Sequence, residues 1–233
     1  THTLRANATD AAGNVSEDAS FTLRVDTEAP GVPTIDSALD DVGSIQDPLA
    51  SGGVTDDPTP TLKGTAEAGS LVTIYDGETK IGSVKADSEG KWSFTPTSNL
   101  SEDKHSFTVT ATDSAGNVSD SSNVFEITTD YHAPDTKYLA ITGFDDDVGK
   151  VTGQVVSGGS SDDKQPVISG TGTAGDTITV STTLDGVTRE LGTAVVDANG
   201  KWTLALSESN ALAEGLNNLT AVETDPAGNS TSP

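Results

Sequence analysis

One six-residue motif occurs three times in the chain, and its spacing limits what the chain can fold into. The motif is Thr-Asp-x-Ala-Gly-Asn, found at residues 9–14, 112–117 and 224–229. Successive copies start 103 and 112 residues apart, which is the size of one small domain rather than of a solenoid turn. The chain is therefore predicted to be an array of similar domains.

Three further motifs occur twice with a similar offset. They are Asp-Asp-Val-Gly at 40–43 and 146–149, Thr/Ser-Asp-Asp at 55–57 and 161–163, and Gly-Lys-Trp at 90–92 and 200–202. The repeated residues are mainly Asp, Gly and Asn, without a catalytic grouping of Ser, His or Cys. An enzyme has one site, whereas this chain carries the same acidic loops in each repeat. The pattern therefore favours a non-enzymatic, modular protein.

The composition suits small β-domains and excludes several partners. Only 33% of the 233 residues are hydrophobic and 4% are aromatic, so each core must be small, as in a thin two-sheet sandwich. The net charge of −24 disfavours binding to nucleic acid or to an anionic membrane. There is no Cys, which excludes disulfides and thiolate metal sites. No apolar run is long enough to insert into a membrane, and we expect a monomer.

Short β-rich runs separated by turn residues set the expected fold class. In the first complete repeat they lie at 61–64, 72–75, 80–84, 92–94, 107–111 and 124–127. Strands at this spacing, with Gly and Asp turns between them, are typical of an antiparallel sandwich. We predict an all-β chain of tandem Ig-like domains, each a Greek key of about seven strands, arranged end to end.

Two Asp-x-x-Ala-Pro linkers, at 26–30 and 130–134, mark the expected domain boundaries. They are short and end in Pro, which makes them semi-rigid. Residues 1–30 are then the C-terminal strands of a preceding repeat, expected to be disordered or packed on a neighbour. Residues 31–134 are a complete domain, and residues 135–233 are a second domain, truncated at its C-terminus.

Taken together, these motifs carry a family resemblance. Asp-Asp-Val-Gly, the Ser-Gly-Gly-x-Thr/Ser-Asp-Asp loop, the turns at 64–69 and 170–175, Gly-Lys-Trp and Thr-Asp-x-Ala-Gly-Asn occur in the same order in both repeats. The chain resembles the bacterial Ig-like repeats of giant adhesins exported by type I secretion, the SiiE-like non-fimbrial adhesins and biofilm-associated proteins. The resemblance implies a calcium-stiffened rod on the bacterial cell surface, with a role in adhesion and virulence.

The acidic motifs are the candidate calcium sites. Following the strands up and down a sandwich brings Asp40, Asp41, Asp56, Asp57 and Asp130 to the pole where the next domain begins, opposite Asp225 and, as a further candidate, Asp197. Clustered carboxylates repel one another unless a hard divalent cation, bound by six to eight oxygens, lies between them. The full predicted set is Asp26, Asp40, Asp41, Asp56, Asp57, Asp113, Asp130, Asp146, Asp147, Asp162, Asp163 and Asp225.

Each feature also has a plain structural interpretation. The Asp-Asp loops can be solvated Asx turns, and Thr-Asp-x-Ala-Gly-Asn is equally suited to a tight turn and to a calcium ligand. Trp92 and Trp202 alternate with Phe94 and Leu204, which favours core positions over sugar-stacking platforms. The histidines do not recur at matching positions, which argues against a catalytic role.

Three functions remain open at this point. The first is a calcium-stiffened extracellular stalk that projects an adhesive tip, with the neighbouring Ig-like repeats as partners and host-cell glycans bound through other parts of the parent protein. The second is a glycan- or protein-binding module that uses Tyr131, His132 and Tyr138. The third is a spacer of a secreted polysaccharide-active enzyme.

Overall fold

The computed structural model describes residues 1–184 and 186–232, and all of their regular structure is β. No helix occurs among them, so none is long and apolar enough to cross a membrane. The predicted strands of the first complete repeat are each present, within three residues at either end. The all-β prediction is confirmed. The last residue of the predicted second domain, 233, lies outside the described residues.

Backbone contacts group the chain into two compact units, which do not coincide with the sequence repeats. The first unit consists of Thr1–Ser37, Leu62–Thr95 and Ser106–Phe125. The second consists of Ala38–Thr61, Pro96–His105 and Glu126–Pro233. The acidic loops at 40–41 and 55–57 therefore belong to the same compact unit as the whole second repeat.

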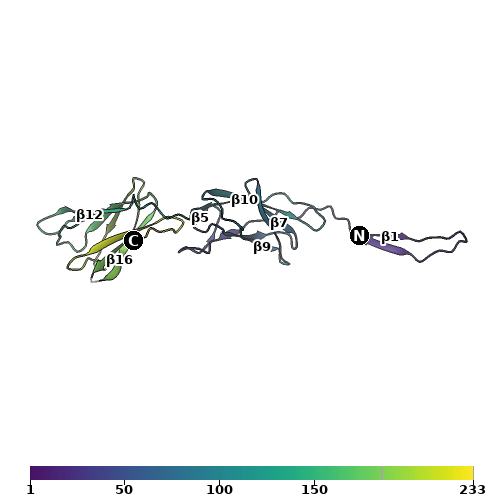
Figure 1. Ribbon diagram of the computed structural model, residues 1–233, viewed down its shortest axis with the longest axis horizontal. Coiled ribbons are helices and arrows are strands. Elements are labelled where there is room, and N and C mark those ends of the chain that lie inside the picture. The colour runs from purple at the N-terminus through teal and green to yellow at the C-terminus, as the bar shows by residue number, and fades with distance from the viewer. Residues whose placement is uncertain (185, 233) are drawn as a thin grey trace. The chain divides into compact units, whose positions relative to one another are not determined.

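In the first unit, the N-terminal residues form a two-stranded antiparallel hairpin (Figure 1). Its strands are β1 (His2–Ala6) and β2 (Ala19–Leu23), with Leu4 opposite Phe21. The side chains of both strands are exposed, except for partly buried Leu23.

The other strands of this unit carry the first repeat. β7 pairs with β8 on one edge and with β10 on the other, and β6 pairs with β9. Their bounds are β6 (Thr61–Thr65), β7 (Leu71–Asp76), β8 (Thr79–Lys85), β9 (Lys91–Phe94) and β10 (Lys104–Thr112). Along β10 every second side chain is buried, as expected for a strand with one face on a core.

The second unit contains the remaining strands. β5 pairs in parallel with β11, and β3 pairs with β4. The second repeat forms one sheet in the order β13-β12-β14-β17 and another in the order β16-β15-β18. The bounds are β3 (Ser37–Leu39), β4 (Pro48–Leu49), β5 (Gly53–Thr55), β11 (Phe125–Thr129), β12 (Ala140–Asp146), β13 (Gly153–Val155), β14 (Val167–Thr171), β15 (Thr177–Leu184), β16 (Val187–Val195), β17 (Lys201–Ala205) and β18 (Asn218–Thr224).

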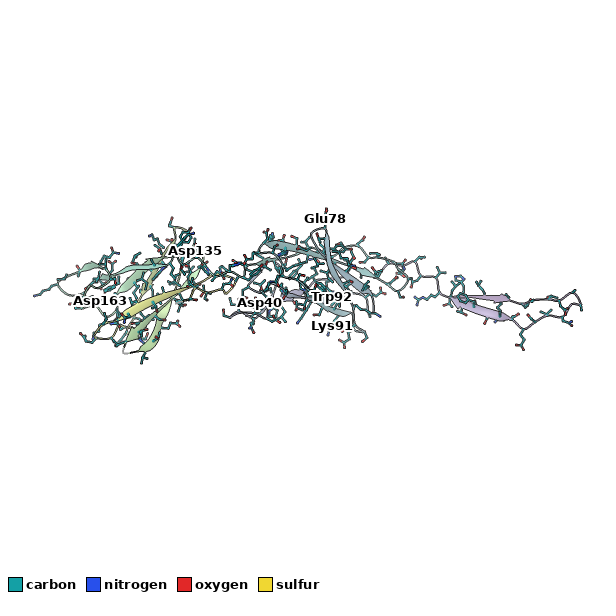
Figure 2. All side chains as sticks on the ribbon, in the orientation of Figure 1. Asp40, Glu78, Lys91, Trp92, Asp135 and Asp163 are labelled. Carbon is teal, nitrogen blue, oxygen red and sulfur yellow. The ribbon has the colours of Figure 1, made fainter. Side chains whose placement is uncertain are left out.

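Both tryptophans are core residues, as the sequence predicts. Trp92, labelled in Figure 2, is 4% exposed and Trp202 is 2% exposed. Trp202 is part of the core of the second repeat, with Ile168, Ile178 and Val180 among its members. Buried at this level, neither ring is available as a sugar-stacking platform.

Each Trp packs against a glycine on the neighbouring strand. A Cβ on Gly64 would lie 2.8 Å from Cζ2 of Trp92 and 2.0 Å from the carbonyl oxygen of Thr34, and Gly170 has the same relation to Trp202. The indole ring therefore lies so close to the backbone of the glycine that no side chain fits at that position.

Replacing Gly64 by Ala is expected to lower the free energy of unfolding by about 1–3 kcal/mol, because the added methyl group overpacks the contact with Trp92 and Thr34. The matched control is Gly31→Ala, where a Cβ would have no atom within 4 Å. Urea unfolding measures both variants. Equal stabilities for the two would show that the glycine–tryptophan contact is not tightly packed.

Candidate functional site

The Asp-Asp-Val-Gly loop of the first repeat is tied to the Thr-Asp-Asp loop by a buried hydrogen bond. The Thr55 hydroxyl donates to Asp40 Oδ2 at 2.6 Å, and the Val42 N–H donates to Asp40 Oδ1 at 3.0 Å. Asp40 and Thr55 are 1% and 0% exposed. Asp40 Oδ2 therefore joins the two loops, and Oδ1 closes a turn within the first loop.

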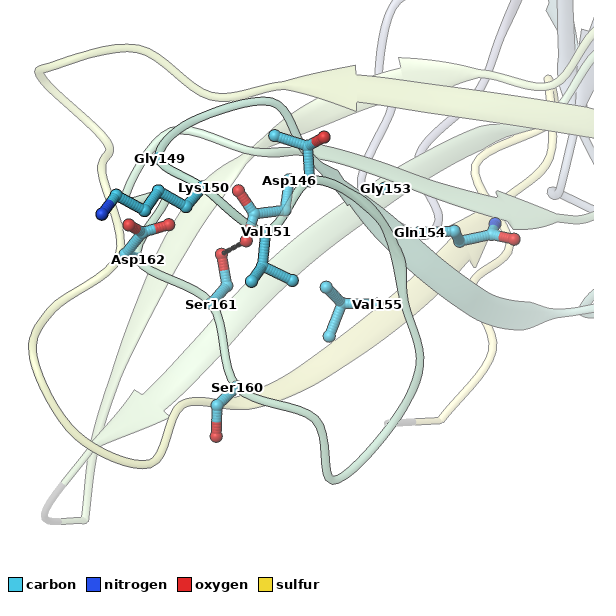
Figure 3. Close-up of a pocket in the computed structure, with 11 residues that line it drawn as sticks. Asp146, Gly149, Lys150, Val151, Gly153, Gln154, Val155, Ser160, Ser161 and Asp162 are labelled. Carbon is cyan, nitrogen blue, oxygen red and sulfur yellow. Dashed lines mark hydrogen bonds between the residues drawn. The ribbon is translucent and has the colours of Figure 1, made fainter.

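The second repeat has the same arrangement. The Ser161 hydroxyl donates to Asp146 Oδ2 at 2.7 Å, as Figure 3 shows, and the Val148 N–H donates to Asp146 Oδ1 at 3.2 Å. These loops line a cavity of about 670 Å³, whose wall includes Asp146 and Asp162. The recurrence shows that the motif pair is a structural unit in both repeats.

Asp56 and Asp57 directly follow Thr55 and are almost fully buried. They are 6% and 2% exposed, and burial is the main cause that raises the pKa of each carboxyl group, followed for Asp56 by the charge of Asp40. The Thr59 N–H donates to Asp57 Oδ1, but Oδ1 of Asp56 is buried without a hydrogen-bond partner. An ionised carboxylate in this position is unfavourable unless something compensates its charge.

Gly43 allows Asp56 to lie against the first loop. Its φ of +65° is in the left-handed region, and a Cβ there would lie 1.9 Å from Asp56 Oδ2. Gly149 has the same conformation, with Asp162 in the place of Asp56. Asp162 itself is exposed, however, and so are Asp41 and Asp147.

The Thr-Asp-x-Ala-Gly-Asn motif is a turn closed by its own aspartate. Asp113 Oδ1 accepts hydrogen bonds from the N–H groups of Ala115 and Asn117, and Oδ2 accepts one from Asn117 Nδ2 at 2.7 Å. This side-chain hydrogen bond is the main cause that lowers the pKa of Asp113. Asp10 and Asp225 make equivalent bonds, so each of the three aspartates caps its own turn.

The asparagines of the second and third turns also bind the preceding linker. Asn117 Nδ2 donates to the backbone carbonyl of Asp26 at 3.3 Å, and Asn229 Nδ2 donates to that of Asp130 at 2.8 Å. The side chain of Asp26 pairs with Arg24 at 3.3 Å. The backbone carbonyl of the first residue of each linker thus accepts a hydrogen bond from the turn near the end of the repeat that follows.

In the second unit, the turn at residues 224–229 lies against the Asp-Asp-Val-Gly loop of the first repeat. The Ser44 hydroxyl donates to the Gly228 carbonyl at 3.3 Å, and Ala227 is only 1% exposed, whereas its counterpart Ala115 is exposed. The charge of Asp225 contributes to the raised pKa of Asp56. The structure therefore brings Asp225 near the loop residues that the sequence predicts as its partners.

Two further carboxylates, those of Asp176 and Glu223, lie near Asp225. Asp176 is 5% exposed and Glu223, on β18, is 0% exposed with a buried, unpartnered Oε2. Asp130, Asp176 and Asp225 line a cavity of about 280 Å³. Burial, and after it the neighbouring Glu223, raises the pKa of Asp176 to about 6.

The second unit thus holds a group of carboxylates that we call the acidic cluster. Its members are Asp40, Asp56, Asp57, Asp130, Asp176, Glu223 and Asp225. Within the described residues, no three acidic or histidine side chains already stand close enough together to hold one metal ion. Asp26 and Asp113 belong to the first unit, and the carboxylate of Asp197 caps its own turn.

The sequence of the two repeats matches a known family. Residues 31–131 and 139–233 match the family model of the bacterial Ig-like domain. The chain belongs to this family. The predicted resemblance to bacterial Ig-like repeats is confirmed, and with it the tandem Ig-like fold class. No curated protein matches the chain.

Several solved structures are similar to these Ig-like repeats, at low identity. The BSP domain of a biofilm associated protein is 21% identical over 87% of this chain, with a TM-score of 0.30. A tetra-tandem repeat from the extending region of a large adhesion protein is 20% identical over 98%, with a TM-score of 0.33. The chain spans 28% of the length of the first of these two structures and 53% of the length of the second. Fibronectin(III)-like modules of Clostridium thermocellum CbhA are 16% identical over 87% of this chain and 90% of theirs, with a TM-score of 0.41. Similarities this distant do not bear on function.

Motif searching misses Asp176 and Glu223 because neither belongs to a repeated motif. Their counterparts in the first Ig-like repeat are Ser70 and Ala111. Glu223 occupies an inward position of β18, where β10 has an apolar residue. The sequence signal that could have identified Glu223 is a carboxylate at a strand position that holds Ala111 in the other repeat.

The raised pKa of Asp176 makes stability depend on pH. The folded chain binds more protons than the unfolded chain between pH 3.8 and about 6, so the free energy of unfolding falls as the pH rises through this range and stays lower above it. In chelator, Asp176→Asn is expected to raise the free energy of unfolding by about 1–3 kcal/mol at a pH near 8. The gain should shrink as the pH approaches 4.

Urea unfolding over a pH series measures this effect. The control is Glu208→Gln, which removes one negative charge from an exposed position. A gain from Asp176→Asn that is the same at every pH would rule out titration of Asp176 as the cause.

Proposed function

We propose that the chain is a stalk segment of a bacterial surface adhesin, in which calcium bound at the acidic cluster stiffens the connection between successive Ig-like repeats. Membership of the bacterial Ig-like family supports an extracellular, structural role without enzymatic activity. The observation that carries the proposal is the buried carboxylate of Asp56, whose Oδ1 has no hydrogen-bond partner.

The donor chemistry of the cluster fits a hard cation. All donors are carboxylate oxygens, and two of them, Asp56 Oδ1 and Glu223 Oε2, are buried and unpartnered. Two carboxylates about 5 Å apart repel by roughly 3 kcal/mol at an effective dielectric constant of about 20. A divalent cation removes this repulsion, and calcium accepts the variable oxygen geometry of irregular loops better than magnesium does.

Residues from both Ig-like repeats would hold the ion. Asp56 and Asp57 come from the acidic loop of the first repeat, Asp130 from the linker, and Asp176, Glu223 and Asp225 from the second repeat. An ion shared in this way adds a contact between the two repeats that depends on calcium. The side chains must move to reach it, because no three of them stand at ligand spacing now.

Calcium titration by isothermal calorimetry on the chelator-treated full chain tests the site. Asp56→Asn is expected to weaken the tightest binding event at least about tenfold, because it removes one negative charge from the ligand set. The control is Asp162→Asn, the matching position of the second repeat, which is exposed. Equal losses in both variants, or none in either, would refute a site at Asp56.

Small-angle X-ray scattering, extrapolated to zero concentration, tests the stiffening itself. Adding calcium to the chelator-treated chain is expected to make the maximum dimension larger and better defined, since the ion restricts motion between the repeats. Asp56→Asn should show a smaller change. A scattering curve indifferent to calcium would contradict the stalk mechanism even if the ion binds.

A binding-module function is less well supported by the aromatic residues near the second linker. The Tyr131 hydroxyl donates to the Leu100 carbonyl at 3.3 Å, and Lys137 covers the ring of Tyr138 at 4.5 Å from its centroid. Tyr138 is nevertheless 53% exposed. Glycan-array screening of the full chain tests this alternative.

A further inference from the structure

The hydrogen bonding of β11 continues past its last residue into the linker. Thr129, at the end of β11, donates its N–H to the Asp103 carbonyl at 3.1 Å. Asp130, the first residue of the linker, donates its N–H to the Thr55 carbonyl on β5 at 2.9 Å. Successive N–H groups of an extended chain point to opposite sides. The segment that contains Asp103 therefore lies along one side of the linker entrance, and β5 lies along the other.

A side chain supplies the next acceptor on the Asp103 side. The Tyr131 N–H donates to Glu102 Oε1 at 3.0 Å, at the place where a longer strand would meet a backbone carbonyl. His132 Nδ1 bonds to the same oxygen, and because a carboxylate oxygen only accepts, Nδ1 carries the hydrogen. The Glu102 carboxylate thus binds two consecutive linker residues at once.

The ring of Tyr131 adds to this contact. Its hydroxyl group donates to the Leu100 carbonyl at 3.3 Å, and its ring centroid lies 5.4 Å from that of His132. Residues 100–103, which we call the strap, therefore bind the linker through main-chain and side-chain oxygens. These bonds join groups of the protein alone, so they need no ion.

Asp130 lies between the residues that the strap holds. Its N–H bonds to the Thr55 carbonyl, and its own carbonyl accepts the Asn229 amide at 2.8 Å. Both of its neighbours in the chain bond to the strap, so its backbone is held from three directions. Its side chain lines the same cavity as Asp176 and Asp225. The strap therefore helps to fix where the linker carboxylate enters the acidic cluster.

We propose that Glu102 is a positioning residue, which fixes Asp130 at the acidic cluster by holding the two residues that follow it. The proposal rests on the calcium site proposed above, in which Asp130 supplies the linker ligand. Because the bonds of Glu102 form without an ion, this ligand is in place before calcium binds. A ligand that is ordered in advance costs less binding free energy than one that binding must order.

Three variants separate the hydrogen bonds of Glu102 from its charge. Glu102→Ala removes both, whereas Glu102→Gln removes the charge and keeps an oxygen that accepts the same hydrogens. Glu214→Ala is the matched control, because Glu214 follows Leu212 at the distance at which Glu102 follows Leu100, and it pairs with Lys164 at 3.7 Å. Glu102 and Glu214 are both exposed, so all three variants should fold.

Hydrogen exchange of the Tyr131 N–H, followed by NMR on the full chain in chelator, tests the strap without calcium. Glu102→Ala is expected to speed this exchange at least about fivefold, because the amide loses a charge-assisted hydrogen bond. Glu102→Gln and Glu214→Ala should exchange more slowly than Glu102→Ala. Equal rates in Glu102→Ala and Glu102→Gln would overturn the proposal.

Calcium titration by isothermal calorimetry tests the effect on the site. Glu102→Ala is expected to bind calcium at least about threefold more weakly than Glu102→Gln, since both lack the charge and only Glu102→Gln keeps the linker ordered. Glu214→Ala should bind as the parent chain does. Equal affinities of Glu102→Ala and Glu102→Gln would overturn the positioning role. No calcium binding in the parent chain would refute the site proposed above and this role with it, whereas the exchange rates would still show whether the strap holds the linker.

Discussion

A hydrogen bond from a hydroxyl group to a buried aspartate organises the acidic end of each repeat. Thr55 bonds to Asp40 and Ser161 bonds to Asp146, with nearly equal lengths of 2.6 and 2.7 Å. The same hydroxyl accepts the N–H of Asp57 or Asp163, so one oxygen fixes two loops at once. Asp56 is buried close to this bond, and its Oδ1 has no hydrogen-bond partner.

Much of this fold follows from local sequence pattern. The alternation along β10 and the turn residues around it predict the strands, and the alternation of Trp92 with Phe94 predicts its core position. The repeated Asp-Asp motifs likewise predict which loops adjoin one another. These features are carried by residues close in sequence, where strand periodicity and turn chemistry decide the outcome.

The remaining features depend on contacts that no local pattern contains. Asp113 and Asp225 have the same motif, yet only the turn of Asp225 is covered, because Ser44 and Ile45 lie against Gly228. Asp56 and Asp162 share a motif position but differ in burial, since the neighbouring segments differ. Glu223 faces inward because β18 has period two, and only alignment with Ala111 reveals the substitution.

The asparagine of the Ala-Gly-Asn turn has a consequence for how the connection between repeats responds to its surroundings. Asn117 and Asn229 hold the carbonyls of Asp26 and Asp130 through a neutral amide. Such a bond neither titrates nor needs an ion, unlike the carboxylates nearby. At the second connection, the Asn229 bond is indifferent to salt and acidity, whereas the carboxylates of the acidic cluster are sensitive to both. If calcium binds at this cluster, as proposed, its loss relaxes the joint without releasing it.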